Sequence, residues 1–250
     1  MNFTEILEHH LLDHAYFRLP AVAGVSLPVS KHVVMLWIAG ALAVLFFVPV
    51  GLAARAGRRN TVVGMVEAVA VFVRDEIVLP NLGEDGRRYL PYFLSLFFFI
   101  LFCNLLGMVP FGATATGNIA VTAALALTTF AMINLAGMRA QGVGPYVKNL
   151  VPHGLPVWLL PLMFPIEILG LVTKSFALCI RLFANMIAGH IVILAFMALI
   201  FLFGSVLVAP VSVAAAVGMD LLEIFVAFLQ AYIFTLLSAI FIGAAVHPQH

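Results

Sequence analysis

An arginine, Arg181, lies in a run of apolar residues long enough to cross a membrane. The next formally charged residue after it is Asp220, and no acidic residue stands three or four positions away. A charge at membrane depth costs ~2.5–3.5 kcal/mol on insertion scales, so it needs a partner, a watery cavity or the interface. An arginine guanidinium keeps its proton at any physiological pH. The sequence therefore predicts a fixed positive charge that attracts a carboxylate of another subunit and repels a migrating proton.

Two other residues in the same apolar region have the opposite chemistry. His190 and Glu223 can each bind and release protons near neutral pH when their surroundings tune them. His190 is nine residues from Arg181, or about 900° around a helix, which places it on the opposite side. A permanent cation flanked by titratable groups predicts proton traffic that is divided by a barrier.

A narrow polar stripe is expected along the helix that carries Arg181. Glu167, Lys174 and Arg181 are spaced by seven residues, so they fall close to one side of a helix. Asn185 follows Arg181 by one turn on that side. Two simpler roles stay open, namely that Lys174 only snorkels toward the membrane interface and that Glu167 is its structural partner.

A second long apolar helix carries a similar line. Asp220, Glu223 and Gln230 share one face at spacings of three and seven, among neighbours that are otherwise apolar. Two such lines through hydrocarbon predict a buried aqueous path. The alternatives are that Asn185 and Gln230 are interhelical hydrogen-bond partners, and that His190 is a packing residue.

The composition requires that these residues lie in a membrane protein. Of the 250 residues, 64% are hydrophobic and 9% are charged, and the mean hydropathy is +1.16; a soluble domain carries about 25% charged residues. Continuous apolar runs of helical length predict an all-α polytopic membrane protein rather than a barrel. The net charge of +1 leaves no electrostatic footprint for nucleic acid. Cys103 and Cys179 both lie in apolar runs and are expected to be small buried hydrophobes.

Membrane-crossing helices are expected at 32–52, 89–110, 118–138, 158–203 and 211–246. The last two are far longer than an upright span of roughly 30 Å needs at 1.5 Å per residue, so they are expected to be strongly tilted or kinked. An interfacial helix is expected near 62–82, because four charged residues interrupt its apolar sequence.

Basic residues predict the orientation. Six arginines lie between the first and second spans, and Arg139 and Lys148 follow the third, whereas the turn at 111–117 has no charge. Basic loops stay on the cytoplasmic side, so residues 1–31 are expected outside and the C-terminus inside. The expected organisation is three upright spans within 32–138, a cytoplasmic loop at 139–157, and a long tilted hairpin at 158–250 that carries the proton path.

Other site chemistry is not expected. The segment GLVTKS at 170–175 lacks the glycine and the spacing of a phosphate loop. His10 and His14 are four residues apart, a spacing that a polar helix produces by chance as well as for metal binding. We therefore expect no bound nucleotide, no cofactor and no metal.

The segment SFALCIRLFANMIAGHIV at 175–192 is highly specific. With it, the chain resembles subunit a of the membrane (Fo) sector of F-type ATP synthases. Supporting matches are FCNLLGMVP at 102–110, PIEILGLVTKS at 165–175 and EIFVAFLQAYIFTLL at 223–237. The resemblance covers most of 90–240, and the N-terminal third resembles the family mainly in layout.

The resemblance implies a stator beside a rotating ring of c subunits, each with a carboxylate in the membrane. The family's essential arginine matches Arg181 and faces that carboxylate, while two offset half-channels lead protons to and from the ring. Peripheral-stalk b-type subunits and the lipid bilayer are the other implied partners, and the chain is not expected to be catalytic by itself. The family's polar positions match Asn104, Glu167, Lys174, Asn185, His190, Glu223 and Gln230, and Asp220 joins the expected proton path from its place on the last helix.

Two departures from the family pattern are informative. Many bacterial relatives carry Glu where this chain has His190, and His where it has Glu223, which suggests that the two side chains meet across the hairpin. The exchanged pair is similar to the mitochondrial and alphaproteobacterial form. Gly107 stands where some relatives have an acidic residue, so the second span is expected to contribute less to the entry path. A bacterial inner membrane is the favoured location and the mitochondrial inner membrane the alternative.

Other functions remain open from the residues alone. A secondary transporter would use Arg181 to bind an anionic solute and would take up that solute without partners. A quinone-binding subunit of a respiratory complex is a further alternative. Coupling to Na⁺ is also possible, although the imidazole of His190 favours protons.

Overall fold

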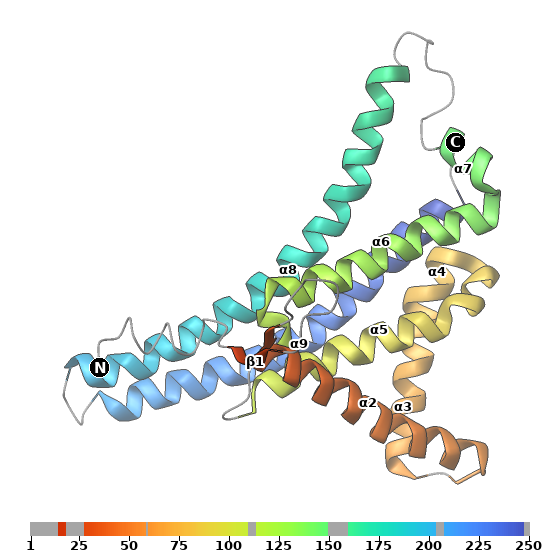
Figure 1. Ribbon diagram of the computed structural model, residues 1–250. Coiled ribbons are helices and arrows are strands. Elements are labelled where there is room, and N and C mark those ends of the chain that lie inside the picture. Colours follow the sequence, from red (N-terminus) through yellow and green to blue (C-terminus); the bar gives the residue numbers. More distant parts are fainter. Residues whose placement is uncertain are drawn as a thin grey trace. The chain divides into compact units, whose positions relative to one another are not determined.

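The computed structural model describes residues 15–18, 28–58, 60–109, 114–149, 160–203 and 208–247. Within these ranges the chain is helical except for two short strands and the connecting turns (Figure 1). Strands β1 (Ala15–Arg18) and β2 (Pro28–Ser30) pair antiparallel, with Ala15 opposite Ser30. The strand pair was not predicted, and most of the expected external segment 1–31, including His10 and His14, lies outside the described residues. The predicted all-α class is confirmed.

Five helical segments are long and apolar enough to cross a membrane, as predicted. One of them runs from Thr61 to Gly107 and so includes the helical stretch before α5. The principal helices are α2 (Lys31–Arg55), α5 (Gly86–Gly107), α6 (Ile119–Gln141), α8 (Leu160–Phe203) and α9 (Ala209–Val246).

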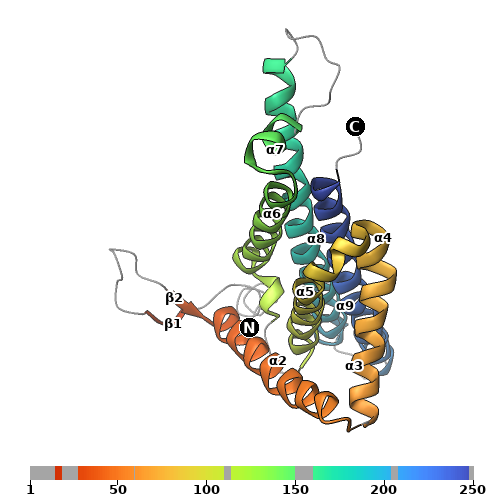
Figure 2. The ribbon, with the colours of Figure 1, turned by 90° about the vertical axis from the view of Figure 1, so that its right-hand side faces the viewer.

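The region expected as an interfacial helix is a run of three helical pieces. These are α3 (Thr61–Phe72), a π-helical piece η1 (Val73–Val78) and α4 (Leu79–Leu82). The 3₁₀ turn η2 (Gly83–Asp85) follows, and the chain then changes direction into α5 (Figure 2). Gly83 has φ +61°, a conformation that glycine adopts without steric cost. Whether this run lies in the membrane interface stays a prediction.

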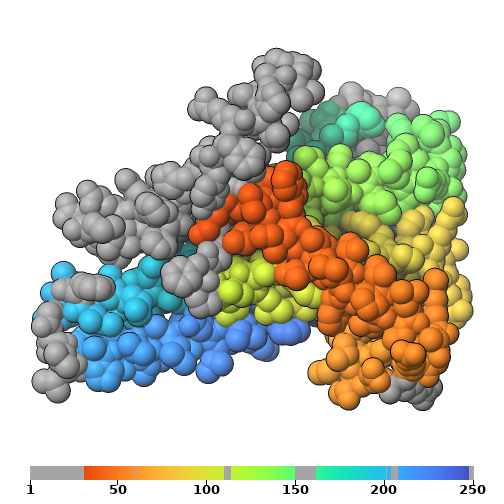
Figure 3. All heavy atoms as spheres, turned by 60° about the horizontal axis from the view of Figure 1, so that its bottom comes forward, coloured from red at the N-terminus to blue at the C-terminus, as the bar shows by residue number. Residues whose placement is uncertain are grey.

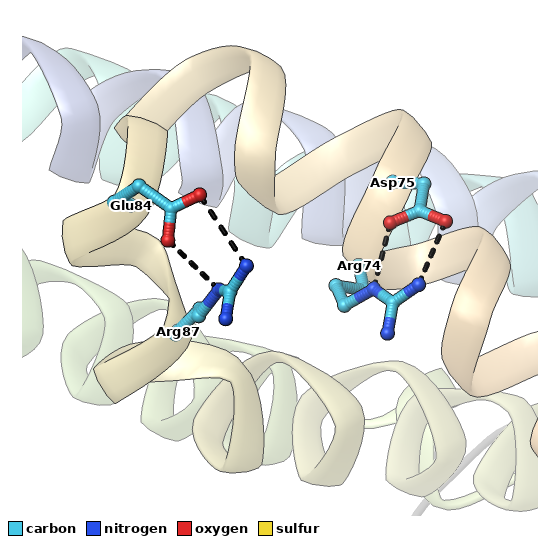
Figure 4. A network of polar contacts seen from close by, with 4 residues as sticks. All are labelled: Arg74, Asp75, Glu84 and Arg87. Carbon is cyan, nitrogen blue, oxygen red and sulfur yellow. Dashed lines mark hydrogen bonds and ion pairs between the residues drawn. The ribbon is translucent and has the colours of Figure 1, made fainter.

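Exposed ion pairs hold the charged side chains of this region (Figure 4). The Arg74 guanidinium donates through Nε and Nη2 to the two carboxylate oxygens of its neighbour Asp75, at 2.7 and 3.0 Å. Arg87 forms an ion pair with Glu84 at 2.9 Å, three residues earlier. Two of the four charges that interrupt the apolar sequence, Arg74 and Asp75, are thus paired with each other and need no partner from another helix.

The last two helices are long, as expected. Helix α8 has 44 residues and α9 has 38, so at 1.5 Å per residue they measure about 66 and 57 Å, against a hydrocarbon core of roughly 30 Å. Pro210 lies at the second position of α9, where its missing N–H costs no helical hydrogen bond. The helices begin within two residues of the predicted boundaries; their tilt in the bilayer stays a prediction.

The chain forms two compact units. The first contains residues 1–44, 99–122 and 181–230, and the second contains 45–98, 123–180 and 231–250. In the first unit, α8 and α9 run side by side, and their atoms form adjacent cyan and blue rows in the space-filling view (Figure 3). Its buried residues Ala39, Cys103 and Ala115 pack together with apolar side chains of α2 and α5.

Candidate functional site

Arg181 lies on the outer side of α8 in the first unit. Its side chain is exposed, as are Ala184 and Ala188 on the next turns, whereas Leu182 and Met186, about 100° and 140° around the helix, are buried. Within the described part of the chain, no hydrogen bond or ion pair involves the Arg181 guanidinium. The charge is therefore presented away from the chain's own core, as the absence of a nearby acid predicted.

His190 and Glu223 contact each other across the two long helices. Nδ1 of His190 lies 2.8 Å from Oε1 of Glu223. The Glu223 side chain is only 3% exposed and that of His190 is 32% exposed. A buried carboxylate needs a polar partner, and the imidazole lies at ion-pair distance from it, although neither Nδ1 nor Oε1 has hydrogen-bond geometry to a described group. The predicted meeting of these two side chains is confirmed, and His190 points to the side of α8 opposite Arg181.

Gly189 makes this contact possible. A Cβ atom at this position would lie 2.9 Å from both Cδ and Oε1 of Glu223, closer than non-bonded atoms approach. The carboxylate therefore occupies the space that any other residue at position 189 would need. The close approach of the Glu223 carboxylate therefore explains why a glycine precedes the histidine in the sequence AGH.

His190 has a second set of partners that the sequence did not indicate. Its Nε2 lies 3.0 Å from the hydroxyl of Thr114 and 3.3 Å from the carbonyl of Gly107. On the other side of Thr114, Nδ1 of His32 donates to the Thr114 carbonyl at 3.0 Å. Thr114 belongs to the uncharged turn between α5 and α6, and His32 lies in the first turn of α2, so neither stands in a polar line on one helix. Because position 107 has no acidic side chain, it was expected to contribute less to the entry path. Its backbone carbonyl nevertheless contacts His190.

Asn104 is fully buried at 0% exposure and uses both ends of its amide. Its Oδ1 accepts a hydrogen bond of 2.8 Å from the hydroxyl of Thr116, in the 3₁₀ turn η3 (Ala115–Gly117). Its Nδ2 donates to the carbonyl of Ala227 on α9, at 3.5 Å. Asn104 therefore connects α5 to the turn and to α9. Its partner Ala227 lies about one helical turn after Glu223.

Asn185 and Gln230 form the interhelical hydrogen bond that was one of the expected alternatives. Nδ2 of Asn185 donates to Oε1 of Gln230 at 2.8 Å. Gln230 is 1% exposed, and its Nε2 has no hydrogen-bond partner among the described groups. A buried amide group without a hydrogen-bond partner costs ~1–3 kcal/mol of stability.

Asp220 does not join this buried group. Glu223 and Gln230 are seven residues apart, or about 700°, and so nearly superimpose along α9, but Asp220 is rotated by about 60° from Glu223. The structure shows the difference, because Asp220 is exposed while the other two side chains are buried. The polar line expected on α9 is therefore split, with one member on the surface.

Glu167 and Lys174 lie in the second unit, where they line a cavity of about 550 Å³. Nζ of Lys174 is 5.5 Å from the ring centroid of Phe241, a cation–π distance. Among the described residues the structure records no ion pair between Glu167 and Lys174. The other polar residues that line the cavity are Asn81, Gln141, Tyr146, Asn149 and His247.

The expected cytoplasmic loop contains a short helix beside this cavity, α7 (Val143–Asn149). Gln141 donates to the carbonyl of Ala245 at 2.7 Å and accepts from Asn149 at 2.8 Å. The Tyr146 hydroxyl donates to Asn134 at 3.1 Å, and burial raises the pKa of Tyr146, so the phenol stays protonated. These amides and the phenol connect the loop to the ends of α6 and α9.

The match to known proteins extends over nearly the whole chain. Residues 33–243 match the family described as ATP synthase A chain. The chain belongs to this family. It is 52% identical over 228 residues to the ATP synthase subunit a of Myxococcus xanthus, covering 90% of this chain and 75% of that protein. It is 46% identical over 258 residues to the subunit a of Chloroherpeton thalassium, covering 97% of this chain and 77% of the relative.

The expected family is thus confirmed. A further relative, the ATP synthase subunit a of Pelodictyon phaeoclathratiforme, is 44% identical over 265 residues, covering 98% of this chain and 77% of that protein. The region matched to the family contains every predicted site residue from Asn104 to Gln230. The alphaproteobacterial or mitochondrial likeness of the exchanged His–Glu pair stays a prediction.

Proposed function

We propose that the chain is the proton-translocating stator subunit of the membrane sector of an ATP synthase. Family membership supports this role, because the relatives are named as subunit a of that enzyme. The observation that carries it is Arg181, a permanent cation in a membrane helix that faces outward without an acid from the described part of its own chain. A carboxylate on a neighbouring c subunit is the partner with the required charge.

The outer half of the path uses the buried group of the first unit. A proton from outside reaches His190 and Glu223, which lie 2.8 Å apart, with Gln230 and Asn185 one or two turns further along the same two helices. It then neutralises a ring carboxylate. The neutral acid rotates into lipid at low cost, because its charged form would be expensive there.

The inner half of the path uses the cavity of the second unit. Glu167 and Lys174 line it, and so do amides beside the loop that carries Arg139 and Lys148. The basic residues of this loop support a cytoplasmic location for it. When the ring carboxylate comes round to Arg181 from this side, the guanidinium stabilises its ionised form and the proton leaves. Arg181 also repels protons that would otherwise pass straight between the two halves.

The chain itself carries out no bond chemistry in this proposal. Each proton that crosses 100 mV releases ~2.3 kcal/mol, which becomes torque on the ring only if direct leakage is slow. The assembly is placed in a bacterial inner membrane, with the N-terminus periplasmic and the C-terminus cytoplasmic. Its partners are the c-ring, b-type subunits of the peripheral stalk and the surrounding lipid.

Cysteine cross-linking tests the stator role directly. We expect Ala188→Cys to cross-link to a cysteine introduced beside the ring carboxylate, because Ala188 is exposed on the same side of α8 as Arg181. The control is Leu127→Cys on α6, a position that is 64% exposed but outside the proposed contact; the natural cysteines are buried and give little background. No cross-link from the Ala188 position, or solute uptake by the purified chain alone in liposomes, would contradict the proposal and favour a transporter.

The Gly189 contact gives a second test. We expect Gly189→Ala to reduce proton conduction through the membrane sector by about tenfold, because the new methyl group displaces the Glu223 carboxylate and such charged contacts are worth ~1.5–3 kcal/mol. Proton flux is measured in inverted vesicles stripped of the soluble sector. The matched control is Gly40→Ala in α2, where a Cβ atom meets nothing within 4 Å. Equal flux in the two variants would show that the observed approach of Glu223 to α8 has no functional role.

A further inference from the structure

Thr114 holds two histidines with two different atoms. Its carbonyl accepts a hydrogen bond from Nδ1 of His32 at 3.0 Å, and its hydroxyl lies 3.0 Å from Nε2 of His190. The residue is 4% exposed, so this hydroxyl is enclosed by protein. It lies on the Nε2 side of His190, away from the Nδ1 contact with Glu223, and the predicted orientation puts this turn on the outer side.

The hydroxyl of Thr114 differs from those of threonines inside the helices. Thr128 donates to the carbonyl of Leu125 and Thr235 to that of Ala231, so both hydroxyls are used within their own helix. Thr114 precedes η3 in an extended conformation, with φ −67° and ψ 114°. Because Thr114 lies outside a helix, its hydroxyl does not donate to a carbonyl of the preceding helical turn. The hydroxyl contacts His190 instead.

Gly107 supplies the room for this arrangement. A Cβ atom at position 107 would overlap the Thr114 side chain and would come within 2.8 Å of the Thr114 Cα. The turn can therefore close onto the end of α5 only because position 107 has no side chain. A polar hydroxyl from the turn occupies the place next to His190 that a side chain at 107 would otherwise take.

The two nitrogens of His190 consequently face two groups that can exchange protons. A hydroxyl both donates and accepts, and a carboxylate accepts. The separations of 3.0 Å on the Nε2 side and 2.8 Å on the Nδ1 side are within reach for proton transfer. Resting on the proposed function, we propose that Thr114 is the hydroxyl relay that delivers protons to His190, and that His32 positions it.

The transfer conserves protons at each atom. The Thr114 hydroxyl passes its proton to Nε2 of His190 and takes a replacement from the outer aqueous side. Nδ1 of His190 passes its own proton to Oε1 of Glu223, so one proton advances and the imidazole of His190 stays neutral. The transfer starts from the Nδ1–H tautomer, whose bare Nε2 accepts from Thr114. It leaves the Nε2–H tautomer, which can donate to the Gly107 carbonyl at 3.3 Å. The imidazole recovers the starting form by rotating or by exchanging protons with water before the next transfer.

Removing the hydroxyl tests the relay. Thr114→Val has nearly the same shape and keeps the carbonyl that binds His32, so we expect flux per assembled complex to fall by at least about tenfold, while Thr114→Ser restores most of it. Proton flux is measured in stripped inverted vesicles and divided by the amount of this chain that copurifies with the ring. Thr114→Ala gives the same test if the valine variant does not assemble. Wild-type flux in Thr114→Val or Thr114→Ala would overturn the proposal.

His32 variants separate positioning from relay. The amide of Asn can replace Nδ1 as a donor to the Thr114 carbonyl but cannot titrate, whereas Leu can do neither. We therefore expect His32→Asn to conduct faster than His32→Leu. If both variants conduct equally slowly, His32 acts through its own titration, and the positioning role is wrong.

Two further variants identify which proposal fails. Thr128→Val removes an exposed hydroxyl that binds its own helix, and it should conduct as the wild type does. Arg181→Ala is measured in parallel. If that variant loses coupled synthesis while Thr114→Val conducts normally, only the relay is wrong; if it keeps coupled synthesis, the stator role itself is wrong.

Discussion

We expect replacement of Arg181 by alanine to abolish ATP synthesis driven by a proton gradient while the complex still assembles. The exposed guanidinium has no hydrogen-bond or ion-pair partner in the described part of the chain, so its loss leaves the chain's own packing intact. Removing a charge from membrane depth even favours insertion, by ~2.5–3.5 kcal/mol. In the proposed mechanism, loss of the cation means that a ring carboxylate is no longer driven to ionise and that protons pass between the two proposed half-channels without rotation. ATP synthesis and passive proton leak in vesicles measure the two effects.

Two companion variants make the Arg181 result specific. Arg181→Lys keeps the charge but loses the planar two-nitrogen fork that matches a carboxylate, so we expect it to block the leak better than alanine while synthesis stays impaired. Arg58→Ala removes an exposed arginine of the loop after α2 and should not affect either measurement. Unimpaired synthesis in Arg181→Ala would show that this residue is not the functional cation.

We expect replacement of Glu223 by glutamine to lower proton flux through the membrane sector by about a hundredfold, the lower range for loss of an acid–base group. The carboxylate is 3% exposed and lies 2.8 Å from His190. Glutamine has nearly the same size and keeps a hydrogen-bonding oxygen, but it cannot bind and release a proton. A loss of flux would therefore reflect the lost proton-binding group rather than altered packing. Glu67→Gln, on the exposed side of α3, is the matched control.

An exchange of the two residues tests whether the pair acts as a unit. His190→Glu alone places two carboxylates together in a buried position, where like charges disfavour ionisation of both. His190→Glu combined with Glu223→His restores one acid and one imidazole in contact, so we expect the double variant to conduct faster than either single variant. A double variant as slow as the slower single variant would show that each residue has a separate role.

The sequence alone determined the class, the long helices and the position of an isolated cation in one of them. Hydropathy along a single helix is a local property, because a membrane span needs about 20 apolar residues whatever its neighbours are. The boundaries of α8 and α9 were therefore predicted to within two residues. The isolation of Arg181 is equally local, because it depends only on which residues stand within one helical turn.

Only the tertiary structure decided which polar residues meet. Spacing placed Asp220 and Glu223 on one face, yet one is exposed and the other buried, because a rotation of about 60° is enough to move a side chain off a helix contact. Helices that are apolar on every side give no strong periodic signal for the side that packs. Contacts of a turn are less predictable still: Thr114 reaches His190 and His32 only because α2 begins and α5 ends close to it, because α8 turns His190 toward it, and because Gly107 has no side chain. Such contacts depend on the rotation and depth of several helices at once, which no single stretch of sequence encodes.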